Sequence, residues 1–153
     1  MKLIIIEDDY SKASKIIDFL SSLPFNNSFE LYKSYSTGIR AVRDLEIDVL
    51  LLDMSLPLYD GDDLKTTEFT TFAGKRILEE ISRINKLCKV IVITAFDYLP
   101  YGDTEISLNQ LDKEMMSNYS KYYVGSIRFD LITGKWSNVL LKYLLKIEGE
   151  LTK

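Results

Sequence analysis

The 153-residue sequence contains no histidine, a single cysteine and three prolines. The lack of histidine excludes Ser-His-Asp and Cys-His nucleophile activation, zinc sites that need histidine, and a phosphohistidine carrier. Cys88 cannot form an internal disulfide, and its apolar neighbours favour a small buried side chain over a reactive thiol. The chemistry open to the chain is therefore largely that of carboxylates.

The sequence also lacks any apolar run long enough to span a bilayer, and Met1 is followed by Lys2 and a short apolar segment rather than a signal pattern. We therefore expect a cytoplasmic protein without membrane contact. A net charge of −4, from 19 basic and 23 acidic side chains, gives no general attraction to nucleic acid, so we expect no direct binding to it. The length and the 46% hydrophobic content suit one globular domain, residues 1–153, without an output domain.

Three short apolar runs in the sequence each end in polar residues. Their continuous hydrophobicity is typical of strands that are covered on both faces of a sheet. The runs are residues 2–6, followed by Glu7-Asp8-Asp9; residues 49–52, followed by Asp53; and residues 90–93, followed by Thr94. The sequence therefore predicts three buried strands with polar carboxyl ends.

Segments with helical spacing of apolar residues alternate with these runs. They begin near residues 11, 39, 77, 108 and 136, while residues 29–35 and 122–127 favour two further strands. The alternation predicts an α/β fold, a doubly wound five-stranded parallel sheet with helices on both faces. Asp9 is expected to cap the first helix, and Ser36 or Thr37 the second. The connections at residues 58–71 and through Pro100 and Gly102 are expected to be loops.

The carboxyl ends of parallel strands meet at one edge of the sheet, where ligands bind in such folds. Glu7, Asp8 and Asp53 should therefore lie together, and carboxylates so placed repel one another unless they share a cation. Mg²⁺ suits the site because it prefers oxygen ligands and often joins carboxylates to a phosphate oxygen. With the ion bound, one carboxylate could attack a phosphoryl group, and the hydroxyl of Thr94 could hydrogen-bond that group.

The same segments resemble the receiver (CheY-like) domains of two-component response regulators. The resemblance lies in residues 4–9 (IIIEDD), 49–57 (VLLLDMSLP), 59–61 (YDG) and 90–95 (VIVITA). It implies a flavodoxin-like sheet with strand order 2-1-3-4-5 and a stand-alone, Mg²⁺-dependent phosphoryl-accepting switch. Each motif alone would be weak, but all of them occur in order and each follows a predicted strand.

Position by position, the resemblance makes Asp53 the phosphoacceptor and Thr94 the switch hydroxyl, with the Ala95 amide beside it. Glu7, Asp8, Asp53 and the backbone carbonyl of Ser55 would form the Mg²⁺ site. The implied partners are a histidine kinase or phosphotransfer protein and an unknown effector protein, and the chain itself would be a monomer or weak dimer. It would be a switch rather than an enzyme, with any autophosphorylation or dephosphorylation incidental.

The sequence departs from this family at two places, and the first makes its C-terminal third atypical. Receivers carry a lysine at the end of strand five that pairs with the acidic edge and the phosphoryl oxygens, but residues 122–129 read YYVGSIRF. Arg128 is the nearest cation there, although its forked guanidinium does not simply replace lysine. The second departure is a long insertion at residues 64–71, which would lie at the edge of the site.

Three alternatives remain open from the sequence. A degenerate receiver would keep the fold and act as a phosphorylation-independent interaction module. The missing lysine favours this alternative. An aspartate-nucleophile phosphatase would need an acid two residues after Asp53, where Ser55 stands. A flavodoxin-like flavin binder would need phosphate-binding amides and hydroxyls where carboxylates follow the first strand.

Tyr119, Tyr122 and Tyr123 are either part of a partner surface or partly buried in the core.

Overall fold

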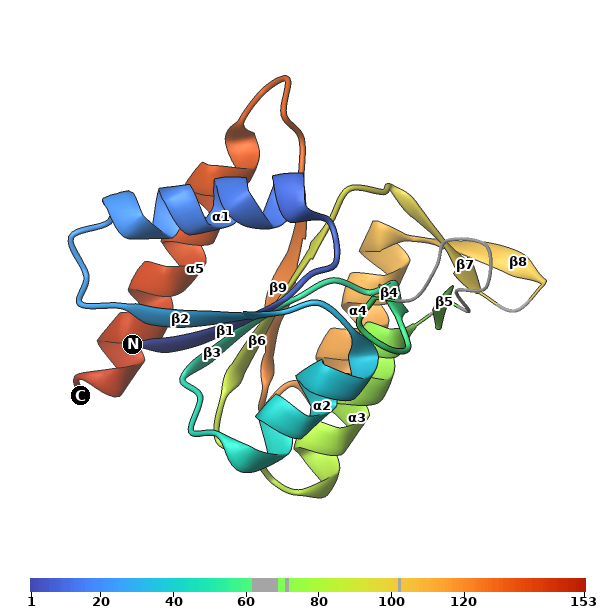
Figure 1. Ribbon diagram of the computed structural model, residues 1–153, viewed down its shortest axis with the longest axis horizontal. Helices are drawn as coiled ribbons and strands as arrows, with labels where there is room; N and C mark the ends of the chain where they lie inside the picture. Colours follow the sequence, from blue (N-terminus) through green and yellow to red (C-terminus); the bar gives the residue numbers. More distant parts are fainter. Residues whose placement is uncertain (62–68, 71, 102) are drawn as a thin grey trace.

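The computed structural model describes residues 1–61, 69–70, 72–101 and 103–153. Its main sheet has five strands, in the spatial order β2 (Ser28–Tyr32), β1 (Lys2–Ile6), β3 (Val49–Leu52), β6 (Lys89–Thr94) and β9 (Tyr123–Arg128). All four neighbouring pairs are parallel. Counted along the chain, these five strands have the order 2-1-3-4-5, so the predicted sheet is confirmed (Figure 1).

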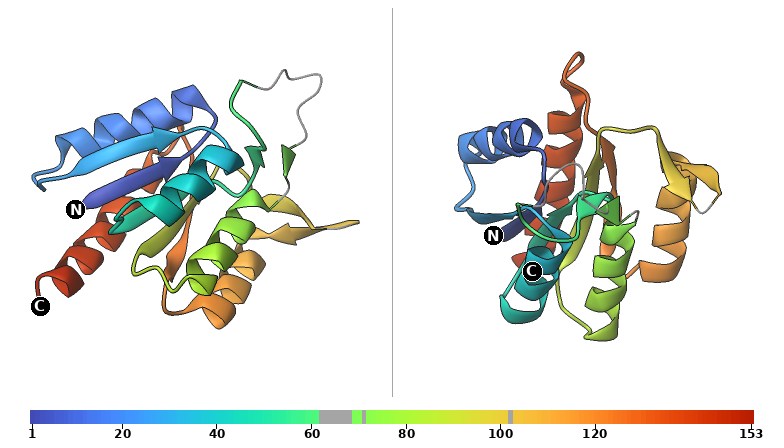
Figure 2. Two further views of the ribbon diagram at one scale, coloured as in Figure 1. Left: turned by 60° about the horizontal axis from the view of Figure 1, so that its bottom comes forward. Right: turned by 45° about the vertical axis from the view of Figure 1, so that its right-hand side comes forward.

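Helices cover both faces of this sheet, as the two views of Figure 2 show. On one face lie α1 (Tyr10–Ser22) and α5 (Lys135–Leu151). On the other lie α2 (Tyr35–Asp44), α3 (Ala73–Arg83) and α4 (Leu108–Tyr119). Among the described residues, none of the helices combines the length and the apolar character that crossing a bilayer requires.

The position of strand β1 between two layers of helices explains why its sequence is continuously apolar. Alternate side chains of a strand point to opposite faces of the sheet. Ile4 and Ile6 therefore join the core beneath α2 and α3, whereas Leu3 and Ile5 join the core beneath α1 and α5. Because each face is covered by helices, every one of these positions is buried, which no alternating sequence would satisfy.

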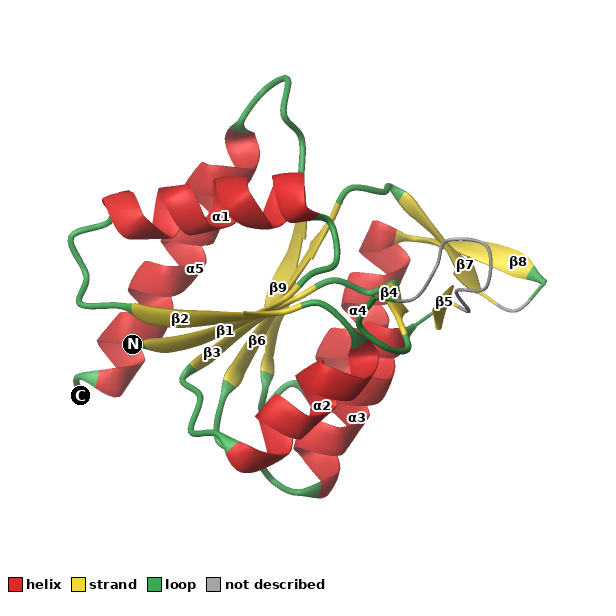
Figure 3. Ribbon diagram, viewed as in Figure 1, coloured by secondary structure: helices red, strands yellow, loops and turns green. Residues whose placement is uncertain are grey.

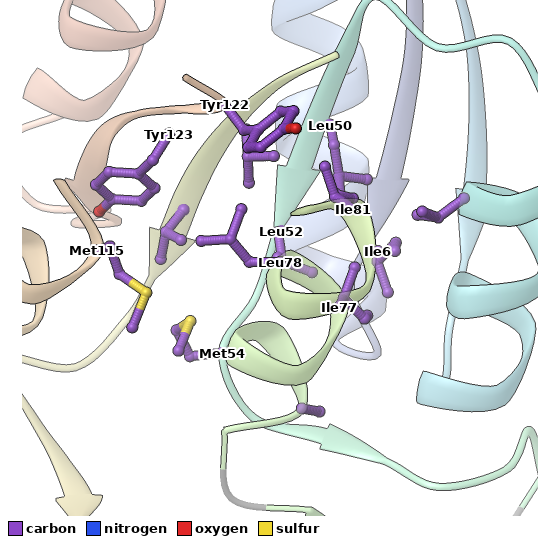
Figure 4. Close-up of a cluster of buried hydrophobic side chains, with 14 of the residues drawn as sticks. Ile6, Leu50, Leu52, Met54, Ile77, Leu78, Ile81, Met115, Tyr122 and Tyr123 are labelled. Carbon is purple, nitrogen blue, oxygen red and sulfur yellow. The ribbon is translucent and has the colours of Figure 1, made fainter. Parts of the chain in front are cut away.

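The core beneath α2, α3 and α4 also contains two of the tyrosines considered for a partner surface (Figure 4). Tyr122 and Tyr123 are both buried. The hydroxyl of Tyr122 donates to Asn85 Oδ1 at 2.6 Å, and that of Tyr123 donates to Asp112 Oδ1 at 2.6 Å. These two rings therefore belong to the core with satisfied hydroxyl groups, as amphipathic aromatic side chains commonly do.

Two short antiparallel strand pairs were not predicted from the sequence. Strands β7 (Tyr98–Tyr101) and β8 (Thr104–Ser107) replace the loop expected between β6 and α4, so that expectation was wrong (Figure 3). The hairpin is favoured because Leu99 faces Ile106 across it, and both side chains pack against the core. Strands β4 (Leu56–Pro57) and β5 (Phe69–Thr70) form the other pair. Within the expected 58–71 loop, residues 62–68 and 71 lie outside the described residues.

The caps of the first two helices place their N-terminal ends. Asp9 caps α1 as predicted, because its Oδ1 accepts from Lys12 N at 3.2 Å. The cap of α2 is Ser34 rather than Ser36 or Thr37, which corrects the sequence expectation. Ser34 has the extended backbone of a cap residue, and its hydroxyl accepts from Thr37 N at 3.3 Å.

Candidate functional site

The carboxyl ends of β1 and β3 bring Glu7, Asp8 and Asp53 together. These strands are adjacent in the sheet, and Asp53 N donates to Ile6 O at 3.0 Å. One carboxylate oxygen from each of the three residues lies within 4.8 Å of the others. The structure thus assembles three of the predicted site residues at one point of the sheet edge.

The first turn of α3 packs closely against the phosphoacceptor candidate. Gly74 N donates to Met54 O at 3.2 Å, and a Cβ added at Gly74 would lie 2.9 Å from Asp53 O and 2.7 Å from Met54 Sδ. The side chain of Asp53 is also held in place, since Met54 N donates to its Oδ1 at 2.9 Å. A residue without a side chain at position 74 is therefore what allows α3 to approach Asp53 this closely.

Burial and mutual repulsion disfavour ionisation of the three carboxyl groups. Burial raises the pKa of Glu7 to about 8, with the negative charge of Asp53 adding to the effect and the ammonium of Lys12 opposing it. Burial is also the largest cause of the raised pKa of Asp8 and of Asp53. A group of carboxyl groups with this tendency is one that a bound cation would stabilise.

A lysine that sequence reasoning did not single out lies against two carboxylates of the cluster. Lys12, in the first turn of α1, is only 5% exposed. Its Nζ lies 2.6 Å from Glu7 Oε2 and 3.7 Å from Asp53 Oδ1, and it donates to Ile93 O at 2.7 Å. The ammonium also lies 5.9 Å from the centroid of the Phe129 ring, within the range of a cation–π contact.

The sequence does contain a signal for Lys12. In an α-helix, residues four apart share a face, and Lys12 precedes Ile16 and Leu20 at this spacing. Lys12 therefore stands on the apolar stripe of α1, where a charged side chain is unusual unless it has buried partners. Sequence reasoning that followed only the apolar members of the stripe passed over it.

Thr94 ends β6 at the same edge and is completely buried. Its Oγ1 accepts from Phe96 N at 3.3 Å, and its backbone carbonyl accepts from Phe129 N at 2.7 Å. The hydroxyl is thus held by one long hydrogen bond in the loop that leaves the strand. Its role as the switch hydroxyl stays a prediction.

Arg128 lies beside Thr94 in the sheet but its side chain is engaged elsewhere. Its Nε donates to Asp97 Oδ1 at 2.9 Å, and its Nη1 donates to Phe129 O at 3.0 Å. Both members of the pair with Asp97 are exposed at the surface. Ser55 follows Asp53 in the turn between β3 and β4, and its carbonyl as a metal ligand also stays a prediction.

The donor set fits a hard divalent cation. Carboxylate oxygens from three residues converge, and they are the ligands that Mg²⁺ selects. Lys12 contributes one positive charge against three carboxylates, which leaves two negative charges if all are ionised. Glu7, Asp8 and Asp53 are thus the residues of this edge that would hold the ion.

The fold and its carboxylate edge define the class: a receiver-like α/β domain. No model of a known protein family matches the chain. In sequence, it is 27% identical over 150 residues to an uncharacterized protein, y4jR, of Sinorhizobium fredii (strain NBRC 101917 / NGR234), covering 97% of this chain and 99% of that protein. It is 21% identical over 150 residues to the Detocs response regulatory protein DtcB of Enterobacter cloacae (strain JD6301), covering 96% and 100%.

Solved structures establish the fold more directly. The CheY-like response regulator receiver domain protein of Methanospirillum hungatei JF-1 matches with a TM-score of 0.63 at 15% identity, covering 99% of this chain and 96% of that chain. The receiver domain of the sensor histidine kinase PA1611 from Pseudomonas aeruginosa PAO1 matches with a TM-score of 0.59 at 17% identity, covering 93% and 95%. That structure has a magnesium ion coordinated in its active site cleft. This chain has the fold of response-regulator receiver domains, which confirms the resemblance found in its sequence.

Proposed function

We propose that this chain is a stand-alone signalling receiver that accepts a phosphoryl group on Asp53 in a Mg²⁺-dependent reaction. The observation that carries the proposal is the convergence of Glu7, Asp8 and Asp53 at the carboxyl edge of a receiver fold. The magnesium ion in the receiver domain of PA1611 supports the choice of ion. Ser55 would add its backbone carbonyl to the ligands.

In the proposed reaction an oxygen of Asp53 attacks the phosphorus atom of a phosphohistidine. The bond from phosphorus to the imidazole nitrogen breaks, the nitrogen keeps the electron pair, and Asp53 becomes an acyl phosphate. Bound Mg²⁺ would neutralise negative charge on the phosphoryl oxygens. The Thr94 hydroxyl, at the adjacent strand end, would hydrogen-bond the new group with the Ala95 amide beside it.

The proposed phosphoryl donor is a histidine kinase or a phosphotransfer protein, and the proposed output is contact with an effector protein. The printed name of DtcB, a response regulatory protein, supports a regulatory role. The chain would act as a cytoplasmic switch rather than as an enzyme, as a monomer or weak dimer, and without direct contact to nucleic acid or membrane. The basis for these points is the receiver fold and the charge and composition of the sequence.

Intact mass spectrometry after incubation with acetyl phosphate and Mg²⁺ tests the proposal. The wild-type protein should gain the mass of one phosphoryl group, and chelation of Mg²⁺ should prevent the gain. Asp53→Asn should not be modified, whereas Asp18→Asn, at an exposed position on α1, should be modified like wild type. A wild-type protein that stays unmodified with acetyl phosphate and with a phosphohistidine donor would contradict the proposal.

A degenerate receiver, acting as a phosphorylation-independent interaction module, is the second candidate. The ion pair of Lys12 with Glu7 favours it, because a built-in cation already neutralises part of the acidic edge. The same mass measurement separates the two functions. A chain that binds Mg²⁺ and a partner protein but never carries a phosphoryl group would be such a module.

A further inference from the structure

Lys12 has hydrogen-bonding capacity left after its two short contacts. A lysine ammonium has three N–H donors. One meets Glu7 Oε2 at 2.6 Å and another meets Ile93 O at 2.7 Å. Asp53 Oδ1, at 3.7 Å, lies within ion-pair range but beyond hydrogen-bonding distance. The third donor is therefore available to an acceptor added on Asp53.

The position of the ammonium is fixed from several sides. Lys12 lies in the first turn of α1, where its own backbone N–H is held by the Asp9 cap. Its side chain is enclosed, with Phe129 on one side and the end of β6 on another. A buried charge with so little freedom loses little conformational entropy when it binds a further group, which makes it an effective anchor for an anion.

Lys12 is also connected to the strand end that carries Thr94. The carbonyl that it contacts belongs to Ile93, the residue immediately before Thr94. Even a small shift of the enclosed ammonium toward an anion on Asp53 would change this hydrogen bond and so act on the adjacent peptide. A contact that differs between two states is what allows a modification to shift the balance between them.

Arg128, the cation that the sequence suggested for this role, is bound to Asp97 at the surface. Lys12 reaches the same acidic edge from α1 rather than from β9. Among the described residues, the buried basic side chain thus lies on the first helix.

We infer that Lys12 is the cation that pairs with the phosphoryl group on Asp53 and links that group to the end of β6. The inference rests on the proposed function of Asp53 as phosphoacceptor. With acetyl phosphate as donor, an Asp53 oxygen forms the new bond to phosphorus, the bond to the acetate oxygen breaks, and acetate leaves with the electron pair. The phosphoryl oxygens then accept the third N–H of Lys12 while the ammonium keeps its proton.

The first test compares Lys12→Met with Lys15→Met, since Lys15 lies exposed on the same helix. Beryllofluoride, a phosphoryl mimic, is titrated in the presence of Mg²⁺ and followed by amide NMR spectra. Loss of a charge-assisted hydrogen bond should weaken beryllofluoride binding about tenfold to hundredfold in Lys12→Met. Lys15→Met should bind it like wild type.

The affinity for Mg²⁺ distinguishes a contact to the phosphoryl group from a merely structural role. Removing a positive charge beside the carboxylates should leave Mg²⁺ binding unchanged or stronger. Structural damage to the edge would instead weaken the binding of both Mg²⁺ and beryllofluoride. Loss of both in Lys12→Met would therefore overturn the inference, as would wild-type affinity for beryllofluoride.

A second pair of variants guards against unfolding of Lys12→Met, which leaves the buried carboxylate of Glu7 without its cation. Glu7→Gln removes that carboxylate, so Glu7→Gln with Lys12→Met should fold. If Lys12 contacts the phosphoryl group, the double variant should bind beryllofluoride at least about tenfold more weakly than Glu7→Gln alone. Equal affinities of these two proteins would overturn the inference.

Failure of the inference differs visibly from failure of the proposed function. If wild-type Asp53 is phosphorylated and Lys12→Met binds beryllofluoride like wild type, the role of Lys12 is refuted but the proposed function is not. If the wild-type protein neither accepts a phosphoryl group nor binds beryllofluoride, the proposed function and the inference on Lys12 are both refuted. Weakened binding in Lys12→Met, combined with intact Mg²⁺ affinity, would support both.

Discussion

The guanidinium of Arg128 is paired with the carboxylate of Asp97, with Nε 2.9 Å from Oδ1, although Arg128 lies directly beside Thr94 in the sheet. Both side chains are exposed, so the pair adds little to the stability of the fold. It does decide the direction of the Arg128 side chain, which follows the loop after β6.

Arg128→Ala should therefore have little effect on the phosphoacceptor site. We expect affinities for Mg²⁺ and beryllofluoride within about twofold of wild type, as for a surface substitution. Titrations of both ligands, followed by amide spectra, check this. A tenfold loss of beryllofluoride affinity in Arg128→Ala would show that the guanidinium leaves Asp97 and reaches the phosphoryl group.

Asp8→Asn should stabilise the protein in the absence of Mg²⁺. Asp8 shares a cluster with Glu7 and Asp53, and removal of its charge relieves repulsion between them. We expect the melting temperature without Mg²⁺ to rise by about 3 °C, which is the change that roughly 1 kcal/mol gives in a domain of this size. The control is Asp18→Asn, which makes the same change in net charge at an exposed position and should leave the melting temperature unchanged.

Although Asp8→Asn should melt at a higher temperature without Mg²⁺, it should gain no further stability when Mg²⁺ is added. Millimolar Mg²⁺ should raise the melting temperature of wild type and of Asp18→Asn, because a ligand that binds only the folded state stabilises it. The increase should be absent from Asp8→Asn. An identical increase in all three proteins would place the bound ion outside the carboxylate cluster.

Thr94→Val tests whether the hydroxyl transmits the state of Asp53. Thr94 is fully buried and its hydroxyl has one long hydrogen bond, from Phe96 N, so valine fills the same space without the polar group. Phosphorylation of Asp53 should continue in the variant, but beryllofluoride should no longer shift the amide signals of residues 123–128. Thr94→Ser keeps the hydroxyl and should retain these shifts, whereas equal shifts in all proteins would assign the coupling elsewhere.

The sequence was sufficient for the sheet because burial on both faces leaves an unmistakable pattern. Residues 49–52 are continuously apolar, since their side chains enter two different cores. The convergence of Asp8 and Asp53 followed from the same pattern, because parallel strands with polar ends must meet at one edge. The acidic edge was thus a consequence of one local signal repeated along the chain, whereas the strand order followed from the resemblance to receiver domains.

The role of Lys12 could not be predicted by the same reasoning. Helical spacing places it on the buried stripe of α1, but only the three-dimensional structure shows that Glu7 Oε2 and Ile93 O are there to receive it. The β7–β8 hairpin was not predicted for a related reason. Its strands are short, and the pairing of Leu99 with Ile106 is stabilised by the core rather than by local preference.

Glu80 gives a prediction that concerns stability and is independent of the site. It accepts from Arg43 Nε at 2.9 Å and from Arg83 Nη2 at 2.6 Å, and so joins α2 to α3. Hydrogen bonds from Arg83, and then from Arg43, lower the pKa of Glu80 from 4.5 to about 2. A carboxyl group whose pKa is lower in the folded state stabilises that state at every pH above its unfolded pKa.

Glu80→Gln should therefore lower the melting temperature at near-neutral pH, because glutamine cannot supply the charge that both guanidinium groups pair with. The difference from wild type should persist down to about pH 4.5, the ordinary pKa of the group, and should disappear as the pH falls through about 2. Glu79→Gln, an exposed neighbour on α3, is the matched control and should melt like wild type throughout. Thermal unfolding followed by circular dichroism over this pH range decides the question. If the difference between wild type and Glu80→Gln stayed constant from neutral pH to about pH 2, shape rather than charge would account for the contribution of Glu80, since protonation would then leave it unaltered.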